Sequence, residues 1–310
     1  MQKVSVVIPC HNAERWIGAT LESVFAQTWR NLEVIVVDDG STDRSPTVVE
    51  GLARNNLTLI RQEKRGAAAA RNVGLASAAG DFVQLLDADD LIDPDKIALQ
   101  MARLDGHSRS IASARWARFR DRPEDARFVD EPVGRDLDPI DWLALSRAEG
   151  LGMMFPALWL MPMAIVRSVG PWREDLSLAD DTEYFTRVVL AADRILVCPG
   201  ALCRYRSGVA GSLSGSKNWP SAFAVLDLCE AQVRGREDSD RMRRGFALSW
   251  QILAHACYPY DPALAKAALA RAQALHPART APAGGPAFRV LSRLIGWRAA
   301  RRLQVASGRP

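Results

Sequence analysis

Short apolar runs alternate with longer amphipathic stretches along the first hundred residues of the chain. The apolar runs are β-branched and continuous, as in strands buried on both faces of a sheet. They lie at residues 4–8, 32–37, 57–60 and 82–86. Between them, apolar residues recur at helical spacing over 13–27, 45–53, 66–78 and 93–104. This alternation predicts an α/β fold with a mostly parallel central sheet flanked by helices.

The pattern is less regular from residue 105 to 215 and helical from there to 310. The expected elements are a strand at 110–119, an exposed Pro-rich excursion at 120–139, a broken apolar segment at 150–170, a helix at 180–192, short strands at 194–197 and 201–205, and a Gly/Ser loop at 207–217 that is a candidate lid. After Asn218 we expect helices, with breaks near Gly235 and Pro262 and a linker at 277–286. Residues 1–215 are therefore expected to form one α/β domain, with halves 1–104 and 105–215, and residues 216–310 a helical extension.

Polar signals follow three of the predicted strands. They are "PCHN" from Pro9, "DDGSTD" from Asp38 and "DADD" from Asp87. Because ligands bind at the carboxyl ends of parallel strands, these segments should share one ligand-binding edge. Asp87, Asp89 and Asp90 would repel one another there, so we expect either a cation at this edge or a need for a base.

Composition and charge narrow the class of protein. The chain has 310 residues, of which 48% are apolar, enough for a sizeable core. The formal net charge of +4 suits an anionic small substrate or a membrane surface, and it is too weak to indicate nucleic acid. The five cysteines are widely spaced and form no C-x-x-C, which favours reduced thiols over a disulfide framework or a zinc site.

The N-terminus enters the run at Val4 without the features of a signal peptide, and no window reaches the ~18 apolar residues of a spanning helix. We therefore expect a cytoplasmic protein that, at most, contacts the inner face of the cytoplasmic membrane. The segment 287–302 has apolar residues among five arginines and no acid. Such a basic amphipathic helix either lies on an anionic membrane or packs on the domain or on a second subunit. The apolar helices after residue 218 could equally form a homodimer interface.

Several nucleotide-binding motifs are absent. The first strand is not followed by G-x-G-x-x-G, and no P-loop sequence occurs. "DADDL" fails as a calcium loop because Leu91 stands where an oxygen ligand is required. Asp87 and Asp89 remain, a pair of hard oxygen donors able to hold a divalent cation that also binds a diphosphate.

Four signals occur in one order: the P-x-x-N turn from Pro9, the DDGS turn from Asp38, the ARN-x-G helix from Ala70 and the D-x-D strand end from Asp87. Together they resemble the family 2 glycosyltransferases with the GT-A fold, over roughly residues 3 to 214. The segment "VGPWREDLSLADDTEYFTRV" is similar to the family's segment that ends in an acidic pair followed by an arginine. The resemblance implies inverting transfer of a sugar from a nucleoside-diphosphate donor. Residues 1–104 would bind the nucleotide-sugar and residues 105–215 the acceptor, a glycan or a lipid-linked molecule of polysaccharide biosynthesis.

The resemblance also implies roles for individual residues. Pro9 and the turn residues Cys10, His11, Asn12 and Glu14 would border the nucleotide, Asp38 and Asp39 would meet the uracil and ribose of a UDP-like donor, and Arg71 would reach the base or phosphate region. Asp87 and Asp89 would form the site for Mn²⁺ or Mg²⁺, with Asp89 favoured as the direct ligand.

Asp181 matches the family's catalytic base, and the like charge of Asp180 could raise its pKa. Trp172 precedes this pair and is either core or a lining of the acceptor pocket. The family's histidine after the "YR" strand is missing here, so Arg206, Ser207 or Ser212 would contact the diphosphate instead. The Q-x-x-R-W signature of processive synthases is also absent, which predicts one sugar per encounter.

Each of these residues has an ordinary structural explanation when taken alone. Asp38 and Asp39 fit a common turn, Arg71 a solvated helix arginine, and Asp180 and Asp181 the acids of a helix N-terminus. Their arrangement at one sheet edge favours a functional site. Two other classes stay open: a non-catalytic relative that binds a nucleotide-sugar or scaffolds an assembly, and a sugar nucleotidyltransferase, which usually needs a Gly-rich basic loop after the first strand.

Overall fold

A central sheet of eight strands organises the residues that the computed structural model describes, which are 2–52, 54–148, 153–209, 217–277 and 286–307. The strands are β1 (Val4–Cys10), β2 (Leu32–Asp39), β3 (Leu57–Gln62), β4 (Phe82–Leu85), β5 (Leu91–Ile92), β6 (Ser110–Phe119), β7 (Trp159–Pro162) and β8 (Arg194–Arg206). Their order across the sheet is β3-β2-β1-β4-β7-β6-β8-β5.

The sheet is mostly parallel, as the alternating pattern predicts. Parallel pairs join β1 to β2 and β4, β2 to β3, and β6 to β8. β7 runs antiparallel to β4 and β6, and β5 runs antiparallel to β8. In this register Cys10 lies beside Asp38, so the polar segments after β1 and β2 leave the sheet at the same edge.

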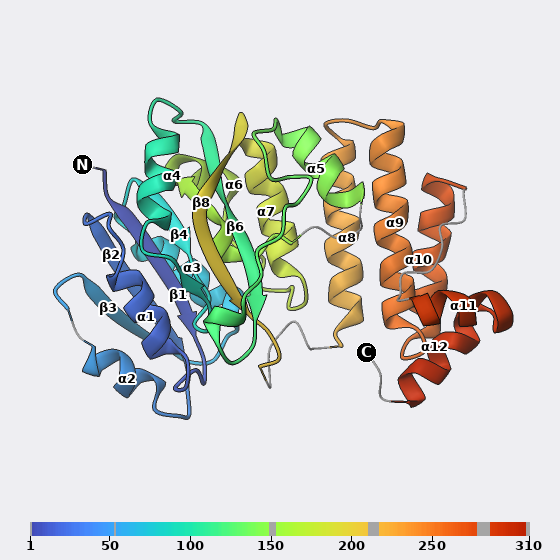
Figure 1. The fold of residues 1–310 in the computed structure, drawn as a ribbon, viewed down its shortest axis with the longest axis horizontal. Coiled ribbons are helices and arrows are strands. Elements are labelled where there is room, and N and C mark those ends of the chain that lie inside the picture. The colour runs from blue at the N-terminus through green and yellow to red at the C-terminus, as the bar shows by residue number, and fades with distance from the viewer. Residues whose placement is uncertain (1, 53, 149–152, 210–216, 278–285, 308–310) are drawn as a thin grey trace.

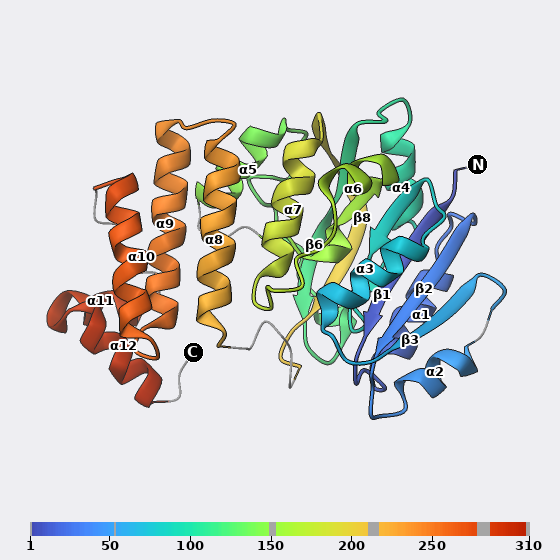
Figure 2. The same ribbon diagram turned by 180° about the vertical axis from the view of Figure 1, so that it is seen from behind.

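Helices cover both faces of the sheet. In the α/β part they are α1 (Ile17–Phe25), α2 (Ser45–Gly51), α3 (Ala67–Ser77), α4 (Lys96–Leu104), α5 (Pro139–Ala148), α6 (Met163–Val169) and α7 (Asp180–Ala191), with short 3₁₀ turns at Pro123–Asp125 and Pro156–Leu158. Helices α1 and α4 lie on one face, and α3, α6 and α7 lie on the other (Figures 1 and 2).

Helix α3 approaches β1 closely because Gly74 has no side chain. A Cβ at Gly74 would lie 2.3 Å from Cγ1 of Val7, far inside van der Waals contact. The glycine of the A-R-N-x-G signal therefore sets how near α3 lies to the sheet. The N-terminal turns of the same helix carry Arg71, so this contact also positions a residue of the predicted site.

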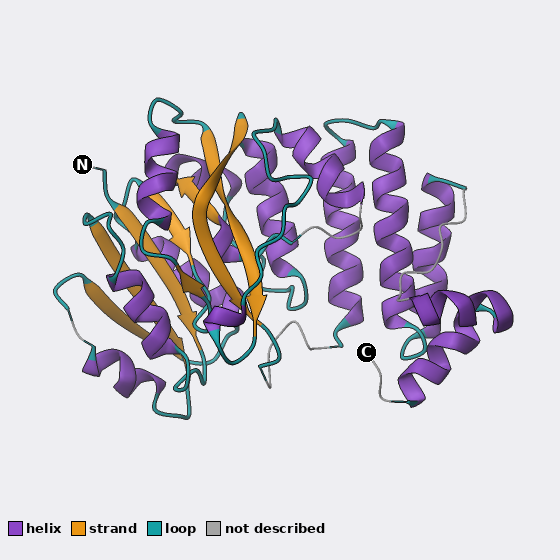
Figure 3. Cartoon of the chain, viewed as in Figure 1, coloured by secondary structure: helices purple, strands orange, loops and turns teal. Residues whose placement is uncertain are grey.

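The C-terminal region is helical, with α8 (Trp219–Arg234), α9 (Asp240–Cys257), α10 (Pro262–Leu275), α11 (Pro286–Ile295) and α12 (Trp297–Ala306). Helices α8, α9 and α10 lie side by side, and α11 and α12 form the end farthest from the sheet (Figure 3). Helix α8 packs on α7, and α9 packs on α5. The breaks expected near Gly235 and Pro262 are confirmed.

Several predicted boundaries are wrong, each for a physical reason. Helix α1 begins at Ile17 instead of residue 13, because residues 13–16 form a turn in which the amide of Ala13 donates to Ser45 Oγ. The two strands expected at 194–197 and 201–205 are one strand, β8, whose pairing with β6 shifts register at Ala114/Arg115. The basic segment expected as one helix is two, since Gly296 has a left-handed φ of 79°.

Other expectations fall on segments with weak patterns. Strands β5 and β7 and helices α5 and α6 come from stretches for which no such element is predicted. The candidate lid lies outside the described residues from 210 to 216. All five cysteines are free and buried, as expected for reduced thiols. No helix among the described residues has the length and apolar character needed to cross a bilayer.

Candidate active site

Two turns at the carboxyl ends of β1 and β2 are bonded to each other. Asn12 accepts at Oδ1 from the amide of Thr42 at 2.8 Å, and Glu14 accepts from the amide of Arg44 at 3.0 Å. Asn12 has a positive φ of 50°, which asparagine tolerates better than most residues. Asn12 and Glu14 therefore shape the edge of the site, and their contact with a nucleotide stays a prediction.

Asp39 is a buried carboxylate whose oxygens are already occupied. Oδ1 accepts from Gln62 Nε2 and from the amide of Arg65, both at 2.7 Å, and Oδ2 accepts from the amide of Gly66 at 2.8 Å. These bonds hold the segment that leads into α3. His11 lies next to it, with Nδ1 2.9 Å from the carbonyl of Asp39 and Nε2 2.9 Å from Lys64 Nζ. A neutral ring protonated on Nδ1 satisfies both contacts.

Asp38 differs from Asp39, because its Oδ1 is buried and has no hydrogen-bond partner within the described structure. The Asp38 side chain is buried at the end of β2, beside Cys10. Burial, with a contribution from Asp38, raises the pKa of the Cys10 thiol to about 12. A buried carboxylate oxygen without a donor is costly, so a ligand N–H or O–H at this position would stabilise it.

Arg71 joins the two acidic parts of the site. Its Nη2 donates to Asp87 at 2.8 Å, and its Nη1 donates to Asp180 at 3.1 Å. The Arg71 side chain is only 6% exposed. Burial alone would lower its pKa, but Asp87 and Asp180 outweigh burial and raise it. The guanidinium is therefore permanently charged and brings the end of β4 and the start of α7 together.

The ring of Trp172 packs against the guanidinium of Arg71. The Arg71 guanidinium carbon lies 4.3 Å from the centre of the Trp172 ring, which in turn stacks on Tyr184 at 4.2 Å. Trp172 is 2% exposed, so the structure places it in the core beneath the site. A lining role in an acceptor pocket stays a prediction.

Asn72 is a residue of the site that our reading of the sequence does not single out, although it stands inside the A-R-N-x-G signal. Its Oδ1 accepts from the amide of Trp172 at 2.8 Å, and its Nδ2 donates to the carbonyl of Trp172 at 3.0 Å. The side chain therefore pairs with the backbone of Trp172 in both directions. This pairing fixes the 172–174 segment against α3. The sequence signal that could have identified Asn72 is its place next to Arg71 in the A-R-N-x-G motif.

The D-x-D segment forms a tight turn after β4. Thr20 of α1 donates to the carbonyls of Ala88 and Asp90, at 2.9 Å each. Burial first, and then the charge of Asp87, raises the pKa of Asp89 to about 6. Burial, and then the charges of Asp89 and Asp87, raise the pKa of Asp90 as well. Oδ2 of Asp90 has no hydrogen-bond partner within the described structure. Ionisation of Asp89 and Asp90 is therefore unfavourable unless a positive charge approaches the turn.

Arg206 lies under this turn. Its amide donates to Asp90 Oδ1 at 2.8 Å, and its Nε donates to the carbonyl of Asp89 at 2.9 Å. The guanidinium also lies 4.1 Å from the ring centre of Trp16. Arg206 is 6% exposed and holds the turn from β8. A contact between Arg206 and a diphosphate stays a prediction.

The second acidic pair opens α7. Ala179, the residue before it, has a left-handed φ of 63°, which is strained for a residue with a Cβ. Burial raises the pKa of Asp180 despite the opposing charge of Arg71. Burial, with help from Asp180, raises the pKa of Asp181 to about 7. Asp181 is thus poised to exchange a proton near neutral pH.

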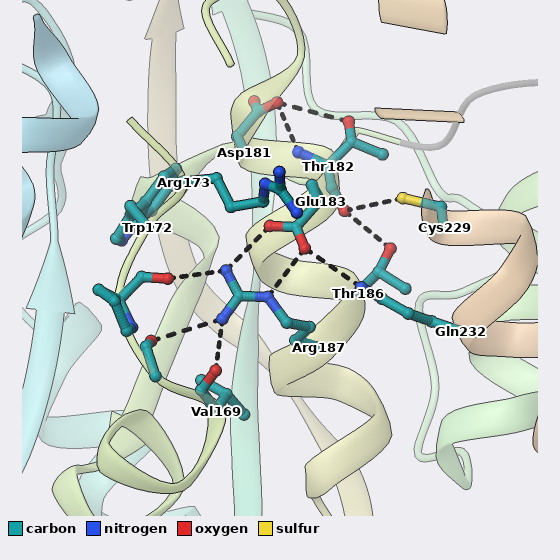
Figure 4. Close-up of polar contacts among 12 residues, drawn as sticks. Val169, Trp172, Arg173, Asp181, Thr182, Glu183, Thr186, Arg187, Cys229 and Gln232 are labelled. Atoms are coloured by element: carbon teal, nitrogen blue, oxygen red, sulfur yellow. Dashed lines mark hydrogen bonds and ion pairs between the residues drawn. The ribbon is translucent and has the colours of Figure 1, made fainter. Parts of the chain in front are cut away.

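A buried network behind Asp181 fixes the first turns of α7 (Figure 4). Glu183 receives two bonds from Arg187, each at 2.9 Å, and Arg187 also donates to the carbonyl of Val169. From α8, Gln232 donates to Glu183 at 3.2 Å, and the Cys229 sulfur lies 3.7 Å from the carbonyl of Thr182. The helical region therefore contacts the residues that immediately follow Asp181.

Helix α8 also holds the segment before α7. Ser221 Oγ accepts from the amides of Ser177 and Leu178, at 2.9 and 3.1 Å. Asn218 at the start of α8 donates to Ser177 Oγ at 2.7 Å. Contacts from α8 therefore hold residues shortly before Asp180 and residues directly after Asp181.

The donor set at this edge fits a divalent cation shared with a diphosphate. No group of three or more His, Cys, Asp or Glu side chains among the described residues is arranged to hold a metal alone. Mg²⁺-type sites commonly use one or two carboxylates together with substrate phosphates. Asp87 and Asp89 supply such a pair, and a cation would favour the ionised form of Asp89, which burial and Asp87 disfavour in its absence.

Sequence comparison places this site within a known group of proteins. Residues 5–166 match the family described as "Glycosyl transferase family 2". The chain is 37% identical over 151 residues to the uncharacterized glycosyltransferase YibD of Escherichia coli, an alignment that covers 46% of this chain and 44% of YibD. The chain spans less than half the length of the curated relatives that head the comparison.

Solved structures show the same fold along nearly the whole chain. S. aureus TarS 1–349 in complex with UDP-GlcNAc has a TM-score of 0.67 at 20% identity, covering 99% of this chain and 92% of that chain. The mannosyltransferase PcManGT from Pyrobaculum calidifontis, in complex with GDP-Man and Mn²⁺, has a TM-score of 0.56 at 20% identity, covering 98% and 86%. The predicted α/β fold with C-terminal helices is thereby confirmed.

Proposed function

The chain belongs to glycosyl transferase family 2, and on that premise we propose that it is an inverting, metal-dependent glycosyltransferase. It moves a sugar from a UDP-linked donor to a hydroxyl group of a glycan or of a lipid-linked acceptor. Nucleotide-sugars occupy the related structures: UDP-GlcNAc in TarS, and GDP-Man with Mn²⁺ in PcManGT. These ligands support a nucleotide-sugar donor for this chain too.

One observation carries the proposal: Arg71 bonds to Asp87 and to Asp180 at the same time. Asp87 of the D-x-D segment and Asp180 of the acidic pair are 93 residues apart in sequence, yet one buried guanidinium joins them. The site would therefore combine a cation-binding pair with a group suited to general-base work. The proposed metal-dependent inverting transfer would use both.

Nucleotide recognition is assigned to the ends of β1 and β2. The unpartnered Oδ1 of Asp38 would accept a hydrogen bond from an N–H of the base. Asp39 holds the 62–66 segment through three bonds, so we assign it a positioning role beside the ribose. His11 and Lys64 lie at the same edge.

Asp87 and Asp89 would hold Mn²⁺ or Mg²⁺. When bound, the cation supplies neutralisation of the charge that develops on the departing diphosphate. Asp89 is held by a turn that Thr20 and Arg206 fix, so its carboxylate is presented with little freedom to move. Such preorganisation lowers the free-energy cost of binding.

Asp181 would accept the proton of the acceptor hydroxyl. As the proton leaves, the acceptor oxygen forms a bond to the anomeric carbon of the sugar, and the bond from that carbon to the diphosphate oxygen breaks. The electron pair of the broken bond stays on the diphosphate. A single displacement of this kind inverts the anomeric configuration.

The first test is calorimetric titration with UDP, GDP, dTDP and CDP, each with and without Mn²⁺. We expect UDP to bind, and to bind more tightly with Mn²⁺. Asp89→Asn should remove the effect of Mn²⁺, whereas Asp105→Asn, which changes an exposed acid at the C-terminal end of α4, should preserve it. Mn²⁺-independent binding in the wild type would overturn the metal assignment.

A second outcome bears on catalysis. The missing histidine after the "YR" strand is the feature that favours a non-catalytic relative. Metal-dependent UDP binding without any hydrolysis or transfer of a bound UDP-sugar, across a panel of acceptors, would establish that alternative and refute the proposed activity.

A further inference from the structure

The far end of the helical region exposes an unusual amount of apolar surface. Val290, Leu294 and Ile295 of α11 are 57%, 76% and 45% exposed, and Leu303 of α12 is 54% exposed. Among the other described residues, only Leu99, Val129 and Tyr260 are large apolar side chains in this class. The exposed apolar residues are therefore concentrated on two short helices at one end of the molecule.

On α11 these residues form a stripe. Val290 and Leu294 are four residues apart, so they lie on one face of the helix. Phe288 is 9% exposed and faces the protein instead. Arg289 and Arg293 are also four apart and run beside the apolar stripe. This arrangement is typical of a helix that lies in the plane of a membrane surface.

Positive charge is also concentrated on these two helices. Residues 286–307 contain five arginines and no acidic residue, whereas the whole chain has a net charge of only +4. On α12, Arg298 and Arg302 are four apart and therefore lie on one face of the helix. No ion pair found among the described residues involves Arg293, Arg298 or Arg302. Carboxylates of the described residues therefore do not neutralise the charge of these three arginines.

We propose that α11 and α12 form a docking surface for an anionic lipid membrane. The apolar stripe would enter the boundary between headgroups and acyl chains, and the arginines would contact lipid phosphates. A symmetric dimer through this surface is disfavoured by the same charges. An isologous contact places one patch against its own copy, and here it would oppose arginines with no acid on either side.

The inference is independent of the proposed transfer reaction, although the two are compatible. A lipid-linked acceptor would be presented at such a surface. Docking through α11 and α12 would also leave the sheet edge open, because these helices lie at the opposite end of the molecule from β1–β3 (Figure 1).

Sedimentation of the full chain with lipid vesicles tests the proposal. We expect binding to vesicles of phosphatidylcholine mixed with phosphatidylglycerol, little binding to phosphatidylcholine alone, and weaker binding as the salt concentration rises. Leu294→Glu and Arg293→Glu should each weaken binding by roughly tenfold, from lost apolar burial and from lost attraction to anionic lipid.

Matched controls exist elsewhere on the surface. Val129→Glu changes an apolar side chain that is 65% exposed, and Arg30→Glu changes an exposed arginine in the loop before β2; both should bind like the wild type. UDP titration of Leu294→Glu should be unchanged, which separates this result from failure of the proposed function.

Two results would overturn the inference. One is the absence of wild-type binding to either kind of vesicle, or a loss of binding in the control variants as large as in the α11 variants. The other is a wild-type dimer, seen by light scattering, that Leu294→Glu converts to monomer without vesicle binding in either protein. That outcome would assign the surface to a second copy of the chain.

Discussion

Asp181 is influenced by a like charge, that of Asp180, and by an opposite charge, that of Arg71. Burial disfavours its ionised form most, Asp180 adds to this effect, and Arg71 partly offsets both, so that its pKa is raised to about 7. At the usual value of 3.8 the carboxylate would be a weak base at neutral pH. The environment therefore converts an ordinary aspartate into a group that can take up a proton during a reaction.

Replacing this carboxylate should separate binding from chemistry. Asp181→Asn is expected to lower kcat for sugar transfer by roughly 10²- to 10⁴-fold, since general-base catalysis typically contributes that much. The affinity for UDP with Mn²⁺ should change little, because the D-x-D carboxylates remain. Initial rates and calorimetric titration measure the two quantities.

The pH profile gives an independent check on the same residue. The base acts when deprotonated, so kcat/KM of the wild type should rise with pH through about 7 and then level off. Asp181→Asn should lack that limb. A variant with the wild-type rate and profile would place the base at another residue.

At the scale of the elements, the hydrophobic pattern predicts a strand well where most residues of the strand are buried. Strands β1 and β2 are buried on most of their residues and read directly as continuous apolar runs. The two residues of β5 and the four of β7 are too short to show a period, and only their partners make them strands. Boundaries at 13–16 and at Gly296 depend on turns that hydrophobic spacing does not encode.

The same distinction applies to the site. The positions of Asp38 and Asp87 at strand ends and of Asp181 at a helix start could be predicted because their sequence patterns are local. The bridge from Arg71 to Asp180 and the packing of Trp172 beneath it depend on contacts across about a hundred residues. No local pattern predicts that α8 holds the segment before Asp180 in place.

Contact between α3 and β1 offers a test of this packing. Gly74→Ala should lower the free energy of unfolding by about 1–3 kcal/mol, because the new methyl group would overlap Val7. Gly18→Ala in α1 is the matched control, since its Cβ would meet Val48 at an ordinary 3.6 Å. Urea denaturation should show Gly18→Ala unchanged or more stable by up to about 1 kcal/mol.

The bracketing of α7 by α8 predicts a kinetic effect from outside the site. Ser221→Ala removes the acceptor of two backbone amides before Asp180, at Ser177 and Leu178. We expect kcat to fall by about tenfold, or about 1.4 kcal/mol in the activation barrier, because the segment before Asp180 would be less well positioned. The UDP affinity should be unchanged. Steady-state kinetics with both substrates varied would measure this.

Ser168→Ala is the control, because Ser168 bonds only to the carbonyl of Ile165 within α6 among the contacts described. It should match the wild type in kcat. Equal kcat values in all three proteins would mean that the segment before α7 holds its position without Ser221.

On the scale of the whole molecule, the acidic turn is a source of instability in the absence of a cation. The pKa of Asp89 rises from 3.8 to about 6, so the folded state binds this proton more tightly than the unfolded state does. The stability that the proton contributes is complete below about pH 4 and is lost as the pH rises through about 6. Function at neutral pH thus conflicts with stability at this residue.

Asp89→Asn should expose that conflict. The amide mimics the protonated acid, so without metal the variant should have a Tm about 2–4 °C above the wild type at pH 7.5 and a smaller difference in Tm at pH 5. Differential scanning calorimetry of both proteins at the two pH values measures it. Comparing the two proteins cancels the opposite contribution of buried His255, whose pKa is lowered to about 4 by burial.

The left-handed turn at Gly296 has a consequence for orientation. It divides the basic segment into α11 and α12, which run in different directions in both views of the ribbon (Figures 1 and 2). A single straight rod resting on a flat layer can roll about its long axis. Two non-collinear helices resting on the same layer define a plane, so a protein attached through both would hold its sheet edge at a fixed height and tilt above the lipid.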